Sequence, residues 1–300
     1  MNNSDIVYQI LNYLDLSDVI RCSTVNKLIN YVCDLQYARL INEYDDILPN
    51  NFFKGSWKQT YIICHKMKSF VKKCPKISLA GAETNIRYRN VTELYVGRKN
   101  IIELPKMIGQ LDNLQNLCAS DNQITKIPKT IGNLVNLRDL WLYDNKITKL
   151  PETIGLLNNL RNLSLYGNKI TKLPETIGQL NNLRELSLCD NNITELPETI
   201  GHLYNLCTLW LYNNQISKLP KSIGQLVSLQ ILGLNHNRLT KLPKSIGKLI
   251  NLQDLWLHNN QLTKLPDSIG QLTNLQILSL KSNKIATLPI IPNINCNIMQ

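Results

Sequence analysis

The chain has 300 residues, of which 43% are hydrophobic, and it carries a formal net charge of +11. It contains no apolar run of about 18 residues, the minimum for a membrane-spanning helix, so the sequence predicts no membrane contact. The eight cysteines are scattered, without the CxxC spacing of a metal site or the dense clusters of secreted caps. We therefore expect free thiols, and because the N-terminus lacks the pattern of a signal peptide, we expect a cytoplasmic protein.

Residues 1–48 predict a small all-α domain, because their apolar side chains recur at helical spacing. Ser17 is suited to cap the second of its helices. Ile6, Ile10, Leu11 and Leu14 share one face of the first helix, and the second helix carries Val19, Ile20 and Val25. Apolar residues continue as far as Tyr44, which gives about three short helices, too few to bury a large core alone.

Residues 49–90 predict a linker and a capping helix. Pro49 and the asparagines that follow it favour a loop. Ser56 is a candidate N-cap for a helix that runs to about Lys73, where Cys74-Pro75 ends it.

Residues 91–290 repeat one pattern every 23 residues. The pattern Leu-x-x-Leu-x-Leu-x-x-Asn-x-Ile, with Leu-Pro-x-x-Ile-Gly-x-Leu-x-Asn-Leu between copies, is typical of leucine-rich repeats, in which each copy adds one strand. Its frame falls on Leu94, Leu117, Leu140, Leu163, Leu186, Leu209, Leu232, Leu255 and Leu278. We therefore predict an α/β solenoid: a leucine-rich repeat horseshoe of about eight to nine turns with a parallel concave sheet.

The Leu-Pro-x-x-Ile-Gly form resembles the leucine-rich subclass of intracellular plant proteins and Ras-pathway scaffolds. That resemblance implies short 3₁₀ or extended segments, rather than full helices, on the convex side of the horseshoe.

Three positions of each repeat are expected to be architectural. An asparagine such as Asn168 follows each strand, where its buried amide can bond the backbone of the adjoining turn. Pro151 presets φ, and Gly155 permits the positive φ that we expect in the return turn. Residues 291–300 leave the frame, and we expect a tail that folds over the last turn as a minimal cap.

The first segment resembles an F-box. Ile6-x-x-x-Ile10-Leu11-x-Tyr13-Leu14-x-x-x-Asp18-Val19, followed by Val25-Asn26-Lys27, has the spacing of that family, although its usual Leu-Pro before the first helix is absent. A Trp-Lys-x-x-Tyr element, here Trp57 to Tyr61, often follows an F-box, and an F-box before leucine-rich repeats is a common pairing. The resemblance implies that a Skp-type adaptor is docked by Ile6, Ile10, Leu11, Leu14, Val19 and Val25. The alternative is a helical cap that only covers the first open turn.

Side chains between the frame leucines are predicted to face outward on the concave sheet, because successive strand residues alternate. The aromatic residues and the histidine among them are the candidate partner-binding residues, since exposed aromatic clusters mark interfaces. They are Tyr95, Trp141, Tyr143, Tyr166, Trp210, Tyr212, Trp256 and His258. The alternative is that these rings stack on one another only for stability, for example Trp141 on Tyr143.

Charge on the predicted concave face favours a protein partner of mixed charge over nucleic acid. Acidic residues such as Asp139 and Asp144 lie beside the aromatic residues, next to a row of Arg138, Arg161 and Arg184. The lysines gather elsewhere, in the position before Leu-Pro, where a solvated edge is the favoured interpretation over a stripe that binds anions.

The sequence contains no motif for catalysis, such as GxxxxGK[ST], GxGxxG, HExxH or GxSxG. We therefore expect no enzyme and no cofactor. His236 and His258 fall on consecutive turns and leave a weak metal site open, although a simple surface pair is favoured.

The predicted function is protein–protein interaction, as the substrate receptor of a Skp–cullin–F-box ubiquitin ligase. The repeats would hold the target, and the F-box-like segment would hold the adaptor. The alternative is a leucine-rich repeat scaffold or inhibitor that binds a signalling or host protein without any connection to a ligase.

Overall fold

The computed structural model describes residues 92–291 and 297–299. The predicted helices of residues 1–48, and the linker and capping helix of residues 49–90, lie outside these described residues. Within them, no helix has the length and apolar character that crossing a membrane requires.

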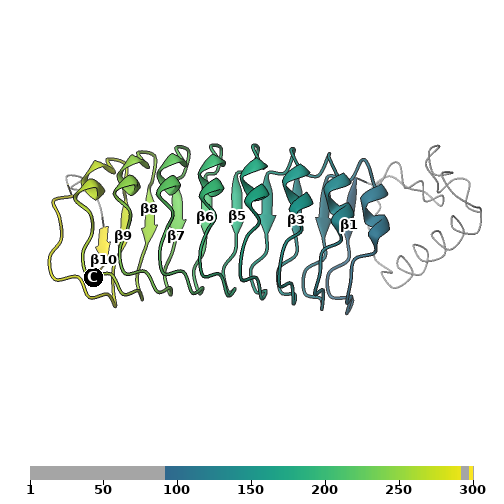
Figure 1. Ribbon diagram of the computed structural model, residues 1–300, viewed down its shortest axis with the longest axis horizontal. Coiled ribbons are helices and arrows are strands. Elements are labelled where there is room, and N and C mark those ends of the chain that lie inside the picture. Colours follow the sequence, from purple (N-terminus) through teal and green to yellow (C-terminus); the bar gives the residue numbers. More distant parts are fainter. Residues whose placement is uncertain (1–91, 292–296, 300) are drawn as a thin grey trace, which may run out of the picture. The chain divides into compact units, whose positions relative to one another are not determined.

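A single parallel sheet runs the length of the described chain (Figure 1). Its 10 strands follow one another in sequence order, so each strand pairs with the next repeat. They are β1 (Glu93–Tyr95), β2 (Asn116–Cys118), β3 (Asp139–Trp141), β4 (Asn162–Ser164), β5 (Glu185–Ser187), β6 (Thr208–Trp210), β7 (Ile231–Gly233), β8 (Asp254–Trp256), β9 (Ile277–Ser279) and β10 (Asn297–Met299). The frame leucines stand in register, as Leu140 pairs with Leu163 and Leu163 with Leu186. The predicted solenoid and its parallel sheet are thereby confirmed.

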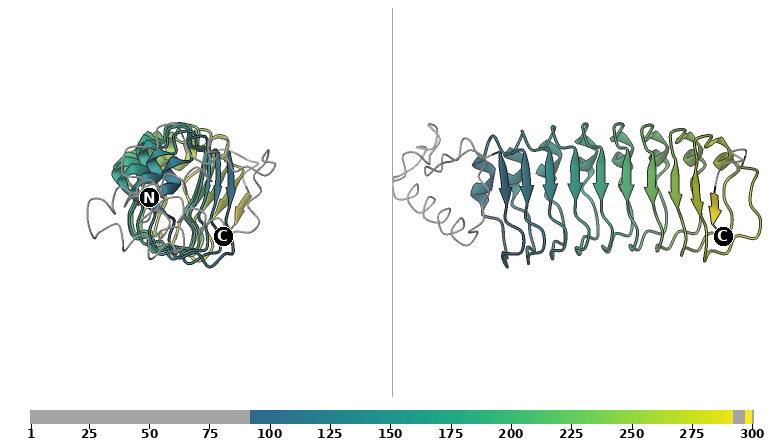
Figure 2. Two further views of the ribbon diagram at one scale, coloured as in Figure 1. Left: turned by 90° about the vertical axis from the view of Figure 1, so that its right-hand side faces the viewer. Right: turned by 180° about the vertical axis from the view of Figure 1, so that it is seen from behind.

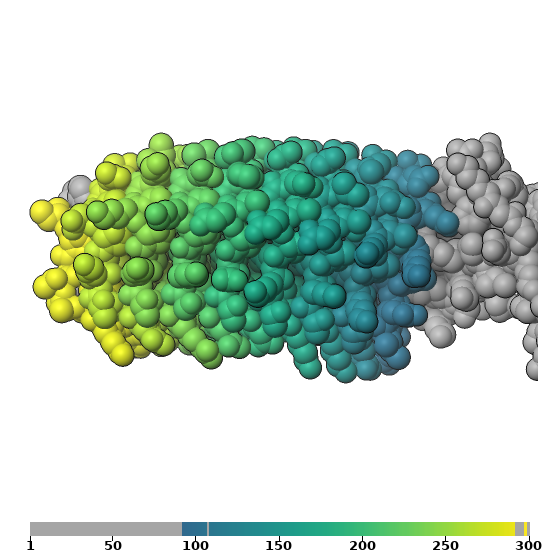
Figure 3. Space-filling model, viewed as in Figure 1, coloured from purple at the N-terminus to yellow at the C-terminus, as the bar shows by residue number. Residues whose placement is uncertain are grey.

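Short 3₁₀ helices cover the side opposite the sheet. They are η3 (Lys106–Gln110), η4 (Lys129–Asn133), η5 (Glu152–Leu156), η6 (Glu175–Gln179), η7 (Glu198–His202), η8 (Lys221–Gln225), η9 (Lys244–Lys248) and η10 (Asp267–Gln271). Each starts after a proline in extended conformation, for example Pro151 with φ −73° and ψ 149°, because proline suits the start of a helix and cannot continue the preceding segment. The prediction of 3₁₀ segments is confirmed, and Figure 3 shows the closely packed atoms of successive repeats in the same view as Figure 1.

The core lies between the sheet and the 3₁₀ helices. Leu140 and Leu142 are fully buried on either side of Trp141, which is half-buried, as strand alternation requires. Ile154, Leu157 and Leu160 fill the core from the returning segment of the same repeat.

An asparagine ladder joins each turn to the next. Asn168 Oδ1 accepts the backbone N–H of Ile147 at 2.9 Å. Its Nδ2 donates to the carbonyl oxygens of Leu142 at 3.0 Å and Leu165 at 2.9 Å. The side chain is 7% exposed, so these bonds satisfy backbone groups that water does not reach. The predicted role of the asparagine column is confirmed.

The predicted reason for the return-turn glycine is wrong. Gly155 does not have a positive φ; among the described glycines only Gly167 does, at 65°. A Cβ on Gly155 would lie 2.5 Å from the carbonyl oxygen of Thr176 in the next turn. The position needs glycine because two turns approach each other closely there, and not because of backbone conformation.

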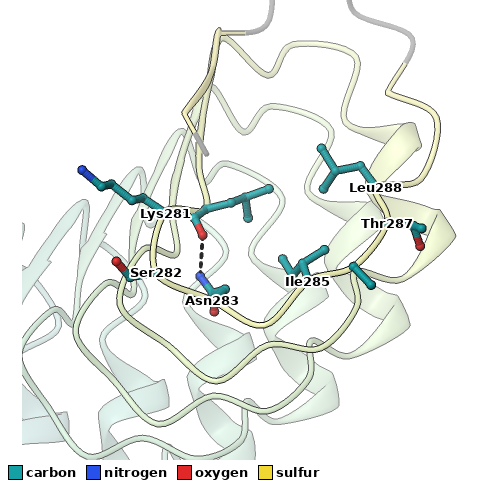
Figure 4. Close-up of a pocket in the computed structure, with 8 residues that line it drawn as sticks. Lys281, Ser282, Asn283, Ile285, Thr287 and Leu288 are labelled. Carbon is teal, nitrogen blue, oxygen red and sulfur yellow. Dashed lines mark hydrogen bonds between the residues drawn. The ribbon is translucent and has the colours of Figure 1, made fainter.

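The C-terminal tail does more than fold over the last turn. β10 pairs in parallel with β9, and Asn297 lies beside Ile277 although it stands outside the repeat frame. An open hollow of about 250 Å³ remains beside the last turn, where a further repeat would continue the stack. Figure 4 shows its lining, including Lys281, Asn283 and Leu288.

Candidate binding surface

All eight candidate partner-binding side chains lie on the outward face of the sheet, which we call the sheet face. Figure 2 (right) shows the strands side by side in front of the 3₁₀ helices, as seen from this side. Each candidate is half-buried, because its neighbours in adjacent turns cover part of its ring. We predicted that these residues face solvent, and in the structure each side chain is only partly accessible.

At the N-terminal end of the sheet face, the rings stack across turns. Tyr95 and Trp141 lie two turns apart, with ring centroids 6.5 Å from each other and planes at 23°. The smaller Cys118 stands between them in register and leaves room for this contact. Tyr143 and Tyr166 stack at 4.8 Å, with nearly parallel planes at 5°. The sequence suggested that Trp141 could stack on Tyr143. In the structure Trp141 stacks on Tyr95, and Tyr143 stacks on Tyr166.

At the C-terminal end, the rings meet edge to face. Trp210 and Tyr212 are 6.2 Å apart at 75°, and Trp256 and His258 are 6.2 Å apart at 78°. The Trp256 Nε1 atom is buried and has no hydrogen-bond partner. Ring contacts thus contribute to stability, but they leave part of each ring accessible to a partner.

A row of left-handed residues borders the sheet face where the strands end. Asp121, Asp144 and Asp190 have φ values of 52°, 50° and 53°, and the equivalent residues of other turns share this conformation. Asp, Asn and Gly tolerate it best, and they occupy this position before every ladder asparagine except where His236 and Ser282 stand. Sequence reasoning missed this row, although the recurrence of Asp and Asn at that position was a visible signal.

A second row lies along the first residue of β1 to β5, and we call it the acid–amide row. It consists of Glu93, Asn116, Asp139, Asn162 and Glu185, which stand opposite one another in the strand register. Asn116 Nδ2 donates to Glu93 Oε1 at 3.0 Å, and Asn162 Nδ2 donates to Asp139 Oδ1. Carboxylates and amides thus alternate from turn to turn.

Burial and neighbouring acids raise the pKa of several sheet-face groups. The pKa of Tyr166 rises to about 12, first through burial and then through the charge of Asp144, with which it also shares a hydrogen bond. Burial raises the pKa of Asp254. Burial and the nearby His236 lower the pKa of His258. Burial on this face therefore makes the charged form of each group less favourable than it is in water.

The structure brings His236 and His258 together, with ring centroids 5.4 Å apart. Neutral neighbours bind both rings: His236 Nε2 lies 3.0 Å from Asn259 Nδ2, and His258 Nδ1 lies 3.0 Å from Ser279 Oγ. In the part of the chain that the structure describes, no group of three or more His, Cys, Asp or Glu side chains is arranged for a metal ion.

The lysines before Leu-Pro lie away from the sheet face. Lys149 and Lys172 are exposed, and Lys172 pairs with Glu195 of the next turn at 3.4 Å. Because both side chains of this pair are largely exposed, it contributes little to stability. These positions fit the solvated edge that the sequence favoured.

Family models match both parts of the chain. A model described as a leucine-rich repeat region matches residues 129–187, 177–261 and 222–296, and a leucine-rich repeat model matches residues 113–134. A model of the F-box domain matches residues 3–38. No curated protein matches the chain.

Solved structures share the solenoid. The leucine-rich repeat domain of the type III effector XopL is 23% identical, with a TM-score of 0.66, over 100% of this chain and 95% of that one. An internalin of Listeria monocytogenes, InlF, is 23% identical, with a TM-score of 0.59, over 71% of this chain. The plant peptide hormone receptor RGFR1, solved in complex with RGF2, is 30% identical, with a TM-score of 0.52, over 67% of this chain. The chain spans 62% of the internalin and 37% of the receptor.

Proposed function

We propose that this chain, which belongs to the leucine-rich repeat proteins and carries an F-box domain before its repeats, is the substrate receptor of a Skp–cullin–F-box ubiquitin ligase. The observation that carries the proposal is the presence of both matches in one chain, with the F-box at residues 3–38 and the repeats up to residue 296. An F-box implies a Skp-type adaptor, and leucine-rich repeats imply a protein partner.

The F-box segment would dock the adaptor through apolar side chains. By resemblance to the family, these are Ile6, Ile10, Leu11, Leu14, Val19 and Val25. They recur at helical spacing, which would give the adaptor one continuous apolar surface.

The sheet face would hold the protein to be ubiquitinated. Its half-buried rings extend from Tyr95 on β1 to His258 beyond β8, and buried Trp or Tyr anchors each contribute about 2 kcal/mol or more at interfaces. The related RGFR1 structure is a receptor in complex with RGF2, which supports partner binding by repeats of this kind. The chain itself would perform no chemistry, and its contribution would be to raise the effective concentration of target lysines near the ligase.

Binding of the full chain to a purified Skp-type adaptor tests the proposal. We expect the wild type and Trp210→Ala to bind, since Trp210 lies in the repeats, and we expect Leu11→Asp to lose binding because it places a charge on the apolar surface. Urea unfolding of the repeats, followed by tryptophan fluorescence, should be the same in the wild type and Leu11→Asp. Failure of the wild type to bind, or undiminished binding by Leu11→Asp, would contradict the proposal.

The second candidate is a scaffold or inhibitor with no connection to a ligase. The observation that favours it is the extent of the aromatic sheet face, which would serve such a role without any adaptor. In that case Trp210→Ala would weaken capture of the partner, while the adaptor would bind none of the variants.

A further inference from the structure

The carboxylates of the acid–amide row keep their charge available for a partner. Asp139 is held by the amide of Asn162 and Glu93 by the amide of Asn116, and both donors are neutral. Among the described residues, the ion pairs are Arg98–Asp121 and Lys172–Glu195, and neither includes a member of this row. Neutral amides therefore fix the position of two of the carboxylates, and no cation of the described residues lies within ion-pairing distance of them.

Aromatic rings lie next to two of these carboxylates. Tyr95 ends the strand that Glu93 begins, and Trp141 ends the strand that Asp139 begins. Their side chains share the outward face, because they stand two residues apart on one strand. A cationic side chain at Asp139 could thus lay its aliphatic stem and its charge against the stacked Tyr95–Trp141 pair.

The spacing of the carboxylates selects the conformation of such a partner. Adjacent parallel strands lie about 4.8 Å apart, so carboxylates on alternate strands are about 10 Å apart. A polyproline II chain has three residues per turn and advances about 3.1 Å per residue, so every third side chain returns to the same side after about 9.3 Å. A polyproline II segment that crosses the strands would therefore place every third side chain over a carboxylate.

The alternation is confined to the N-terminal half of the sheet. In β6 to β9 the equivalent positions are Thr208, Ile231, Asp254 and Ile277. Thr208, Ile231 and Ile277 offer no charge to a cation there, so Asp254 is the single carboxylate among these four positions.

We propose that β1 to β5 bind a segment of the protein target in polyproline II conformation that carries Lys or Arg at every third residue. Glu93, Asp139 and Glu185 would each face one of its cationic side chains. This inference rests on the proposed function, because the segment belongs to the protein that the sheet face holds.

Synthetic peptides test the spacing directly. The probe is a fluorescent nonapeptide with lysine at positions 1, 4 and 7 and serine elsewhere, and its partner is a peptide of the same composition with the three lysines adjacent. We expect the full chain to bind the spaced peptide more tightly in fluorescence anisotropy, with an affinity that falls as salt rises. Equal binding of the two peptides, or binding of neither, would overturn the proposal.

Charge-removing variants test the site. Asp139→Asn and Glu185→Gln keep the shape of the side chains, and we expect each to weaken the spaced peptide up to about fivefold, as for an exposed ion pair. The matched control is Asp112→Asn, an exposed aspartate between η3 and β2, which should leave affinity unchanged. An equal loss of affinity in the control would show that only the net charge of the protein matters, and it would contradict the proposed site.

The same variants separate this proposal from the ligase proposal. Asp139→Asn should bind the Skp-type adaptor as the wild type does, because it lies in the repeats. A chain that binds the adaptor but neither peptide would refute the basic segment alone, and a chain that binds the spaced peptide but no adaptor would refute the ligase role alone.

Discussion

The indole ring of Trp210 lies over Gly233, which stands beside it on the next strand. A Cβ on Gly233 would be 2.8 Å from Cζ3 of Trp210, which is closer than two carbons can approach. Because Gly233 has no side chain, the indole of Trp210, one of the candidate anchor residues, can occupy this place.

Gly233→Ala should displace Trp210 and lower the free energy of unfolding by about 1–3 kcal/mol, as overpacking does. Urea unfolding measures this change, and Ser164→Ala, at the same repeat position on β4, is the control that should change stability little. In the Trp210→Ala background, Gly233→Ala should have almost no further cost, because the clash is gone. An equal loss in the free energy of unfolding in both backgrounds would show that contact with the indole is not the reason for glycine at position 233.

Asn168→Ala should lower the free energy of unfolding by about 1–3 kcal/mol, because it leaves buried backbone groups of two turns without partners. The matched change is Asn159→Ala on the opposite side of the solenoid. Asn159 is exposed and donates one bond to Val135 at 2.8 Å, so its loss should cost less than about 0.5 kcal/mol. Similar costs for the two changes in urea unfolding would contradict the role of the buried ladder.

Gly155→Ala should destabilise the repeats by about 1–3 kcal/mol, because its Cβ would press on the carbonyl oxygen of Thr176 and force two turns apart. Gly97→Ala is the comparison, since its Cβ would lie 3.3 Å from the nearest atoms of Ser120. We expect a clearly smaller loss there in thermal unfolding. If both changes had the same effect, close approach of the turns would not be the reason for the glycine.

Asp254→Asn should stabilise the protein at neutral pH. Burial raises the pKa of Asp254 in the folded state, so the carboxyl favours folding below its unfolded pKa of about 3.9 and loses that contribution as pH rises through the folded value. The advantage of the variant should therefore be present at pH 7 and shrink below about pH 4. Urea midpoints at both pH values measure it, with the exposed Asp267→Asn as the control. An advantage that grows towards acid pH would reverse the assigned sign.

Cys189 should resist alkylation. Burial raises the pKa of its thiol to about 11, and the side chain is 2% exposed. Since the thiolate is the reactive form, iodoacetamide at pH 8 should label Cys189 at least about tenfold more slowly than the more accessible Cys207. Peptide mass spectrometry of the native protein measures both rates, and unfolding in urea should remove the difference.

The repeat frame could be predicted from the sequence because a fixed period places the same residue at the same place in every turn. Leu140, Leu142 and Ile154 had to be buried, and Trp141 had to face outward, whatever the neighbouring turns contained. The leucine-rich repeats and the F-box at residues 3–38 were also recognisable from residue spacing, and the family models confirm both. The individual binding residues remain predictions.

Contacts between side chains of different turns were decided only by the tertiary structure. The sequence does not show that the rings of Tyr95 and Trp141 meet across Cys118. Nor does it show that the indole of Trp210 lies over Gly233, or that the turn of Thr176 approaches Gly155 too closely for a side chain. The strand β10 could not be predicted either, because its residues stand outside the 23-residue repeat although they pair with β9. The period determines which positions are neighbours, but the rotamers, ring planes and close approaches at those positions depend on the packing of particular side chains, which have no counterpart in the spacing of residues along the chain.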